Sequence, residues 1–82
     1  MKNYLSEKQE NELLSKIHEA GFKTEIGFYN WKTLIIYNNI QLGYLNTLNY
    51  IFYPAYREYN KKEEVIKVKE IIKQYKRGVK ND

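Results

Sequence analysis

Two adjacent asparagines near the middle of the chain constrain its fold more than any other feature of the sequence. Asn38 and Asn39 separate two short apolar runs, and asparagine adopts positive φ angles at low cost. Two-residue turns between antiparallel strands require such angles. The sequence therefore predicts a β-hairpin with strands at about residues 33–37 and 40–45.

The two-residue turn also predicts which side chains face one another across the hairpin. Tyr37 is expected opposite Ile40, and Ile35 opposite Leu42, on one face of the sheet. The side chains between them would lie on the other face, because successive residues of a strand alternate in direction.

Two further extended segments flank the hairpin. Alternation over residues 22–29 predicts a half-buried strand with four side chains on one face: Phe22, Thr24, Ile26 and Phe28. After the hairpin, residues 48–53 are again extended until Pro54 ends the run. They either form a separate strand or prolong the third one.

Amphipathic helices are expected at both ends of the chain. The first covers about residues 6–20, where Ser6 begins a capping-box pattern and Gly21 is placed to end the helix. The second covers about residues 61–77, with Asn60 as its expected cap.

This order of elements predicts an α+β fold. Both helices would cover one face of an antiparallel meander of three strands, or of four if residues 48–53 form a strand. One domain is expected over residues 1–82, a length that suffices for one compact core. Cysteine is absent, and the chain has neither a long apolar run nor the apolar region of a signal peptide. These features predict a cytoplasmic protein that does not enter a membrane.

The ionisable residues argue against catalysis and metal binding. His18 is the only histidine, and Asp82, the last residue of the sequence, is the only aspartate. A Ser-His-Asp triad would therefore have only glutamates left to partner His18. A metal ion needs several converging ligands, which one histidine does not supply. The four glycines are scattered, which excludes a phosphate-binding glycine loop. We therefore expect no enzyme activity, no metal and no cofactor, and we interpret His18 as a helix-surface residue.

The basic residues concentrate near the end of the sequence. Residues 1–60 hold six basic and six acidic side chains, so the net charge of +4 comes from residues 61–82. Five lysines fall within one narrow arc of the last helix, with Arg77 outside it: Lys62, Lys69, Lys73, Lys76 and Lys80. Such a stripe is suited to anions or to the phosphates of RNA or DNA, without sequence preference. The competing interpretation is a solvated helix whose lysine stems flank the core.

The aromatic residues form a second candidate site. Nine tyrosines are more than a core of this size can bury. The candidates for partner binding are Trp31, Tyr53, Tyr56, Arg57 and Tyr59, because tyrosine, tryptophan and arginine are enriched where proteins bind one another. The competing interpretation is that these rings cover the sheet edge and the helix junction.

The order of elements resembles that of the double-stranded-RNA-binding domain over nearly the whole chain. Lys61 and Lys62 stand where that family has a lysine cluster at the start of its last helix. In that family the pattern continues toward another lysine, whereas residues 63–65 of this chain are Glu, Glu and Val. The family's glycine-proline-histidine type of loop between early strands is also missing, and residues 30–32 (Asn-Trp-Lys) stand in its place. The resemblance implies binding of RNA.

In its small size, its lack of cysteine and its wealth of tyrosine and asparagine, the chain also resembles accessory proteins of phages and mobile elements, including anti-CRISPR proteins. That resemblance implies inhibition of a host defence or nucleic-acid-processing complex by occupation of a surface. The leading hypothesis is thus a non-enzymatic module that binds a host protein or nucleoprotein complex. The alternative is sequence-independent binding of RNA or DNA through the lysine helix. A homodimer paired through a sheet edge is a third hypothesis.

Overall fold

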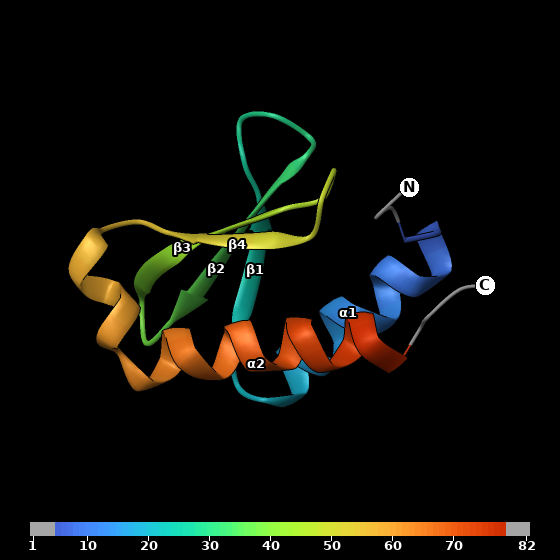
Figure 1. Ribbon diagram of the computed structural model, residues 1–82. Coiled ribbons are helices and arrows are strands. Elements are labelled where there is room, and N and C mark those ends of the chain that lie inside the picture. Colours follow the sequence, from blue (N-terminus) through green and yellow to red (C-terminus); the bar gives the residue numbers. More distant parts are fainter. Residues whose placement is uncertain (1–4, 79–82) are drawn as a thin grey trace.

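The computed structural model describes residues 5–78, which form two helices, one 3-10 helix and four strands. The elements are α1 (Glu7–Glu19), β1 (Lys23–Ile26), β2 (Lys32–Tyr37), β3 (Ile40–Asn46), β4 (Ile51–Pro54), the 3-10 helix η1 (Arg57–Lys61) and α2 (Glu63–Gly78). The strands form one antiparallel sheet in the order β1-β2-β3-β4. Both helices lie on one side of this sheet (Figure 1), so the predicted α+β architecture is confirmed, with a separate fourth strand.

Both ends of α1 match the sequence pattern. At its start, Ser6 Oγ accepts from the Gln9 amide (3.1 Å) while Gln9 Oε1 accepts from the Ser6 amide (3.0 Å), which completes the capping box. At its end, Gly21 has a φ of 101°, and the Phe22 amide donates to the Ile17 carbonyl (3.3 Å). This Schellman ending turns the chain back toward the sheet.

The central hairpin has the predicted turn. Asn38 and Asn39 have φ angles of 53° and 65°, as a two-residue turn between antiparallel strands requires. Tyr37 pairs with Ile40 directly beside the turn, as predicted.

Farther from the turn, the predicted pairing of Ile35 with Leu42 is wrong because β3 contains a bulge. Ile35 pairs with Gly43 instead, and Leu42 is an extra residue without a partner on β2. A bulge shifts the alternation of the strand by one residue. Leu42 and Leu45 therefore both enter the core although they are three residues apart, and Tyr44 faces the opposite side of the sheet.

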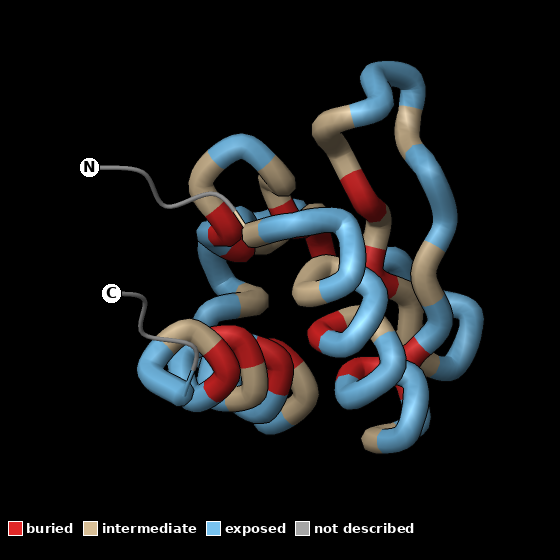
Figure 2. The backbone as a smooth tube through the Cα atoms, turned by 90° about the vertical axis from the view of Figure 1, so that its right-hand side faces the viewer, coloured by how far each residue is buried: buried red, intermediate tan, exposed pale blue. Residues whose placement is uncertain are grey.

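The first strand is shorter than predicted, and its far end is not buried. β1 ends at Ile26, and residues 27–31 form the tip of the β1–β2 hairpin. Phe22 is buried as expected, but Ile26 is 79% exposed and Phe28 is 90% exposed. The hairpin tip projects beyond the helices at the top of Figure 1, and the same loop is mostly pale blue in Figure 2. The helix layer thus ends before the strands do.

The second helix starts later than predicted, and Asn60 does not cap it. α2 begins at Glu63, and the carbonyl of Lys62 accepts from the Ile66 amide (3.0 Å) in its first turn. Asn60 lies in η1, where its Nδ2 donates to the Arg57 carbonyl (3.0 Å). The Oδ1 atom of Asn60, which a cap would use as acceptor, instead accepts from Lys69 Nζ (2.8 Å).

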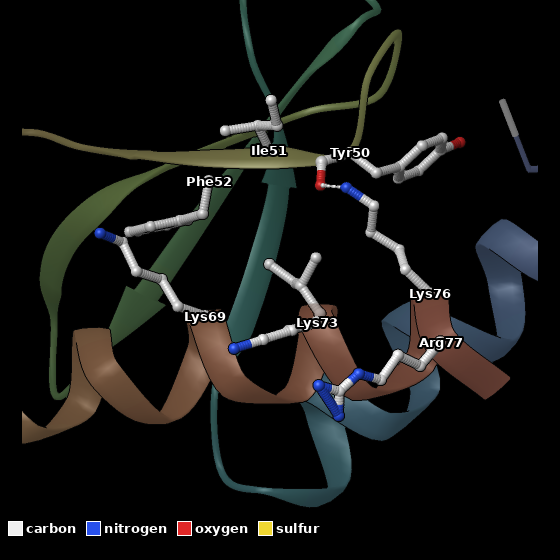
Figure 3. A pocket seen from close by; sticks show the side chains of 8 residues that line it. Tyr50, Ile51, Phe52, Lys69, Lys73, Lys76 and Arg77 are labelled. Carbon is white, nitrogen blue, oxygen red and sulfur yellow. Dashed lines mark hydrogen bonds between the residues drawn. The ribbon is translucent and has the colours of Figure 1, made fainter. Parts of the chain in front are cut away.

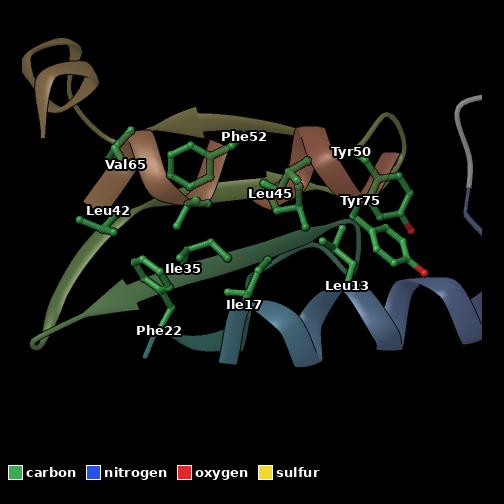
Figure 4. Packing of buried hydrophobic residues seen from close by; sticks show 12 residues of the cluster. Leu13, Ile17, Phe22, Ile35, Leu42, Leu45, Tyr50, Phe52, Val65 and Tyr75 are labelled. Atoms are coloured by element: carbon green, nitrogen blue, oxygen red, sulfur yellow. The ribbon is translucent and has the colours of Figure 1, made fainter. Parts of the chain in front are cut away.

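The core lies between the sheet and the two helices (Figure 4). Among the described residues it contains Leu13, Ile17, Phe22, Ile35, Leu42, Leu45, Tyr50, Phe52, Val65, Val68, Ile72 and Tyr75. Burying such side chains supplies the main stabilisation of a domain this small. None of the helices within residues 5–78 combines the length and the hydropathy needed to span a membrane.

Two core residues are tyrosines whose hydroxyl groups point toward α1 (Figure 4). Tyr50 donates to Glu10 Oε1 (2.8 Å) and Tyr75 donates to Glu12 Oε1 (2.6 Å). Burial, the hydrogen bond and the neighbouring negative charge raise the pKa of Tyr75 to about 12, and the same causes raise the pKa of Tyr50 still further. These bonds connect α1 to the start of β4 and to α2.

Candidate functional site

The face of the sheet opposite the helices carries one row of side chains that runs across all four strands. The register aligns Glu25 with Leu34, Leu34 with Tyr44, and Tyr44 with Tyr53. No described residue packs over this row as a further layer, because both helices lie on the other side (Figure 1). Of the aromatic members of the row, Tyr53 is exposed and Tyr44 is half-buried, so part of each ring is open to a partner.

Three aromatic side chains extend the two rings of this row toward the hairpin tip, and we call the five together the aromatic ladder: Phe28, Tyr29, Trp31, Tyr44 and Tyr53. The Tyr29 ring stacks on Trp31, with centroids 5.2 Å apart and planes inclined by 6°. Trp31 meets Tyr44 edge-on at 6.4 Å, and Tyr44 lies 5.3 Å from Tyr53. Phe28 meets Tyr29 edge-on at 4.9 Å. The rings thus form an uninterrupted series from the tip to β4.

The charged groups near the ladder are few. Lys32 Nζ lies 4.5 Å from the Tyr44 ring centroid and 5.7 Å from that of Trp31, which is cation–π geometry. The register places Lys23 and Glu25 on the same face, at the β1 edge. This surface therefore combines a large aromatic area with a net charge near zero.

The turn between β3 and β4 lies beside the hairpin tip and enlarges the apolar surface there. The Thr47 amide donates to the Trp31 carbonyl (2.8 Å), which joins the turn to the tip. Leu48 in this turn and Ile51 at the start of β4 are both largely exposed. Exposed apolar side chains thus gather at one end of the sheet.

The structure divides the five residues that the sequence proposed for partner binding. Trp31 and Tyr53 belong to the aromatic ladder. Tyr56 and Tyr59 form a separate pair, with ring centroids 5.0 Å apart, and Arg57 begins η1 beside them. Tyr59 is half-buried and packs against the core, so its ring covers the helix junction as the competing interpretation expected.

Sequence reasoning missed Tyr29 and Tyr44, the two rings that join the ladder together. The simple alternation places Tyr44 on the helix face, and only the bulge moves it to the open face. A signal for the bulge was present, because Leu42 and Leu45 are three residues apart with Gly43 between them. Glycine inside a strand often marks a bulge or the close approach of another backbone.

The predicted lysine stripe forms part of a groove between β4 and α2 (Figure 3). Lys69, Lys73 and Lys76 line this groove, which encloses about 470 Å³. Arg77, which the sequence places outside the arc of the stripe, lines the groove too. Arg77 follows Lys73 by four residues, and residues at that spacing lie on the same side of a helix.

The other two lysines of the predicted stripe do not line the groove. Lys62 Nζ lies 5.1 Å from the Tyr59 ring centroid, at the start of α2. Lys80 falls outside the described residues. The groove therefore has four cationic side chains, three of which the sequence had proposed.

Two further observations concern the residue types that bind metal ions and the single histidine. No three His, Cys, Asp or Glu side chains of this part of the chain are placed to hold a metal ion. His18 is exposed, and its Nε2 lies 2.8 Å from Thr24 Oγ1. This contact links the helix surface to β1, and no described carboxylate hydrogen-bonds to the ring.

Comparisons with protein-family models, with curated proteins and with solved structures find no match for this chain. The fourth strand adds an element to the order on which the resemblance to the double-stranded-RNA-binding domain was based. The functional argument therefore depends on the two surfaces themselves.

Proposed function

We propose that this protein is a non-enzymatic module that binds another protein through the aromatic ladder and the adjoining hairpin tip. The observation that carries the proposal is the continuity of five aromatic rings on a sheet face that no described element covers. Exposed apolar surface that is continuous rather than scattered marks a site of interaction. A stable monomer gains nothing from leaving such a surface in water.

The composition of this surface favours a protein over a nucleic acid. Interface cores are rich in tyrosine, tryptophan and phenylalanine and poor in charge, as the ladder is. A protein surface that binds single-stranded nucleic acid needs open aromatic ring faces on which the bases stack, and cationic side chains that follow the phosphates. Tyr29 and Trp31 already stack on each other, and the cations of α2 lie at the groove beside β4, on the helix side of the sheet.

The hairpin tip is the part of this surface best shaped to enter a pocket on the partner. Phe28 is almost fully exposed at the projecting end, and Ile26, two residues earlier at the end of β1, is mostly exposed as well. A large side chain that becomes buried in a partner's pocket contributes a major share of binding energy. Inhibition of a host complex by occupation of its surface would use this geometry, since it needs contact area and no chemistry.

A capture experiment with matched variants tests the proposal. Phe28→Ser with Tyr29→Ser removes the tip rings, and we expect it to weaken partner binding by about tenfold or more without unfolding the protein. Tyr56→Ser is the control, because Tyr56 is an exposed tyrosine outside the ladder. A protein from a host lysate that binds the wild type and the control but not the tip variant supports the proposal.

The single tryptophan supplies an independent readout. Trp31 lies in the middle of the ladder and is the only tryptophan of the chain. Addition of the captured partner should shift the Trp31 fluorescence to shorter wavelength, because the indole ring moves from contact with water into an apolar interface. A captured partner that leaves the Trp31 emission unchanged, and that the tip variant still binds, would show that the ladder is not the interface.

The salt dependence of binding distinguishes the nucleic-acid alternative from binding of a protein through the aromatic ladder. Binding of short RNA or DNA probes through the α2 cations would weaken steeply as salt rises and would be insensitive to the tip substitutions. Tight binding of this kind would favour the alternative over the proposal.

A further inference from the structure

The groove between β4 and α2 has two different walls and an apolar floor. One wall is the free edge of the sheet at β4, and the other is the cationic side of α2 (Figure 3). Phe52 and Ile72 are buried at its base, and Ile51 is exposed beside them. Within the described residues the lining contains four cations and no carboxylate. The groove therefore attracts negative charge that the protein itself does not supply.

The strand wall offers unused backbone groups. In an antiparallel pair, every second residue directs its amide and carbonyl groups to the neighbouring strand. The Ala55 amide donates to the Leu42 carbonyl (2.8 Å), so Ala55 is one of the residues that bond to β3. Counting back along β4 by two residues, Tyr53 directs its amide and carbonyl groups to β3. Phe52, which precedes Tyr53 in the alternation, directs its amide and carbonyl to the free edge. A strand edge of this kind is a template for an added strand.

One end of this edge already receives donors from the helix. Lys76 Nζ donates to the carbonyls of Tyr50 (3.1 Å) and Asn49 (3.4 Å). The dashed line in Figure 3 marks the shorter bond, which crosses from α2 to the start of β4. The edge carbonyls at this end therefore face the cationic wall, and the remaining length of the groove is open beyond Lys76.

The spacing of the helix cations matches that of an extended chain. Lys69, Lys73 and Arg77 follow one another at intervals of four residues, which is about 6 Å of helix rise. Alternate side chains of an extended strand point to the same side and are about 6.7 Å apart. β4 and α2 run alongside each other (Figures 1 and 3), so carboxylates at every second position of a strand in the groove would meet successive cations.

We infer that this groove binds an acidic peptide segment of a partner protein in extended conformation, added as a strand to the edge of β4. The backbone of the segment pairs with Phe52, its carboxylates meet Lys69, Lys73 and Arg77, and its alternate side chains cover Ile51. A nucleic acid fits less well, because the rings of Tyr50 and Phe52 are buried and offer no face for stacking. This site uses none of the five rings of the aromatic ladder and does not depend on them.

The test uses the full-length protein and a labelled peptide of six residues in which glutamate and valine alternate, with binding followed by fluorescence anisotropy. We expect saturable binding that weakens as salt rises. Lys73→Glu should weaken this binding by about tenfold or more. The control is Lys8→Glu, since Lys8 is exposed on the first turn of α1, where negative charge is tolerated; it should bind as the wild type does.

Two further probes decide between strand addition and simple charge attraction. The same peptide with its backbone amides methylated keeps the carboxylates but loses the donors, and it should bind at least about tenfold more weakly. The amide of Phe52 should exchange more slowly with solvent when the unmodified peptide is bound. Equal affinity for the methylated peptide would overturn the inference, as would failure of the unmodified peptide to bind. Preference for a short single-stranded oligonucleotide over the peptide would overturn it in favour of nucleic acid.

Discussion

At the scale of single residues, Gly43 has the least space for a side chain. A Cβ atom at this position would collide with the carbonyl oxygen of Tyr53 and with Pro54 Cα, both of which belong to the backbone of β4. Backbone atoms cannot turn aside as a flexible side chain does. The close approach of β4 to the bulge in β3 thus requires glycine.

We predict that Gly43→Ala lowers the free energy of unfolding by about 2–3 kcal/mol, as overpacking in a rigid environment does. Urea denaturation measures the change. Gly78→Ala is the control, because within residues 5–78 a Cβ there would meet no atom within 4 Å beyond its own helix turn, and alanine favours a helix. Equal stability of Gly43→Ala and the wild type would show that β4 can move away from the bulge.

The buried tyrosines predict a loss of stability at alkaline pH. Because burial and Glu12 raise the pKa of Tyr75 to about 12, the folded protein keeps this proton after the unfolded chain has lost it at about pH 10. The stabilisation is therefore complete below about pH 10 and is lost as the pH rises toward 12. Tyr50, whose pKa is raised by burial and Glu10, acts in the same direction.

Urea denaturation at about pH 8 and about pH 11 checks this prediction. Tyr75→Phe should cost about 1 kcal/mol near neutral pH, because the hydrogen bond to Glu12 is lost. Its stability should then fall less than that of the wild type between the two pH values. An identical fall in both proteins would show that Tyr75 titrates normally in the folded state.

At the scale of elements, the central hairpin depends on a turn in which both residues have positive φ angles. Asparagine tolerates this conformation better than other residues with a Cβ atom, and glycine tolerates it best. We predict that Asn39→Ala lowers the free energy of unfolding by about 1 kcal/mol. Asn39→Gly should be at least as stable as the wild type. Urea denaturation of both variants tests this, and a neutral Asn39→Ala would mean that the turn changes type without cost.

The bulge in β3 is the element-scale feature that creates the ladder. It directs Leu45 into the core and Tyr44 to the open face. Without it, Tyr44 would compete for core space, and no ring would bridge Trp31 and Tyr53. The aromatic surface and the glycine requirement at residue 43 therefore have the same origin.

At the scale of the whole molecule, the two proposed surfaces lie on different sides of one sheet. The aromatic ladder occupies the face without helices, and the cationic groove lies beside β4 on the helix side. A single chain can thus bind one partner surface through apolar contact and an acidic segment through charge. The salt dependence of the two modes should differ, because screening weakens charge attraction and leaves apolar contact largely unchanged.

We predict that the protein without a partner is a monomer whose ladder is open to solvent. Light scattering over a range of concentrations should give the mass of one chain throughout. A mass that doubles with concentration in the wild type, but not in Phe28→Ser with Tyr29→Ser, would show that the ladder joins two copies of this chain. The homodimer hypothesis would then replace binding of a different protein.

The local structure of this protein was largely predictable from the sequence. The capping box at Ser6, the glycine that ends α1 and the asparagine turn were all confirmed, because each depends on backbone conformations that a few neighbouring residues determine. The fold class followed from the order of these elements. The exclusion of enzyme activity from the supply of ionisable residues stays a prediction.

Only the tertiary structure decided which side chains came together. The bulge arose because Leu42 and Leu45 both gain by entering the core, and this shift moved Tyr44 into the ladder. The helix layer ended short of the hairpin tip, which left Phe28 in water although its alternation predicted burial. Local patterns specify helices, turns and strands, whereas register and coverage depend on packing between segments far apart in the chain.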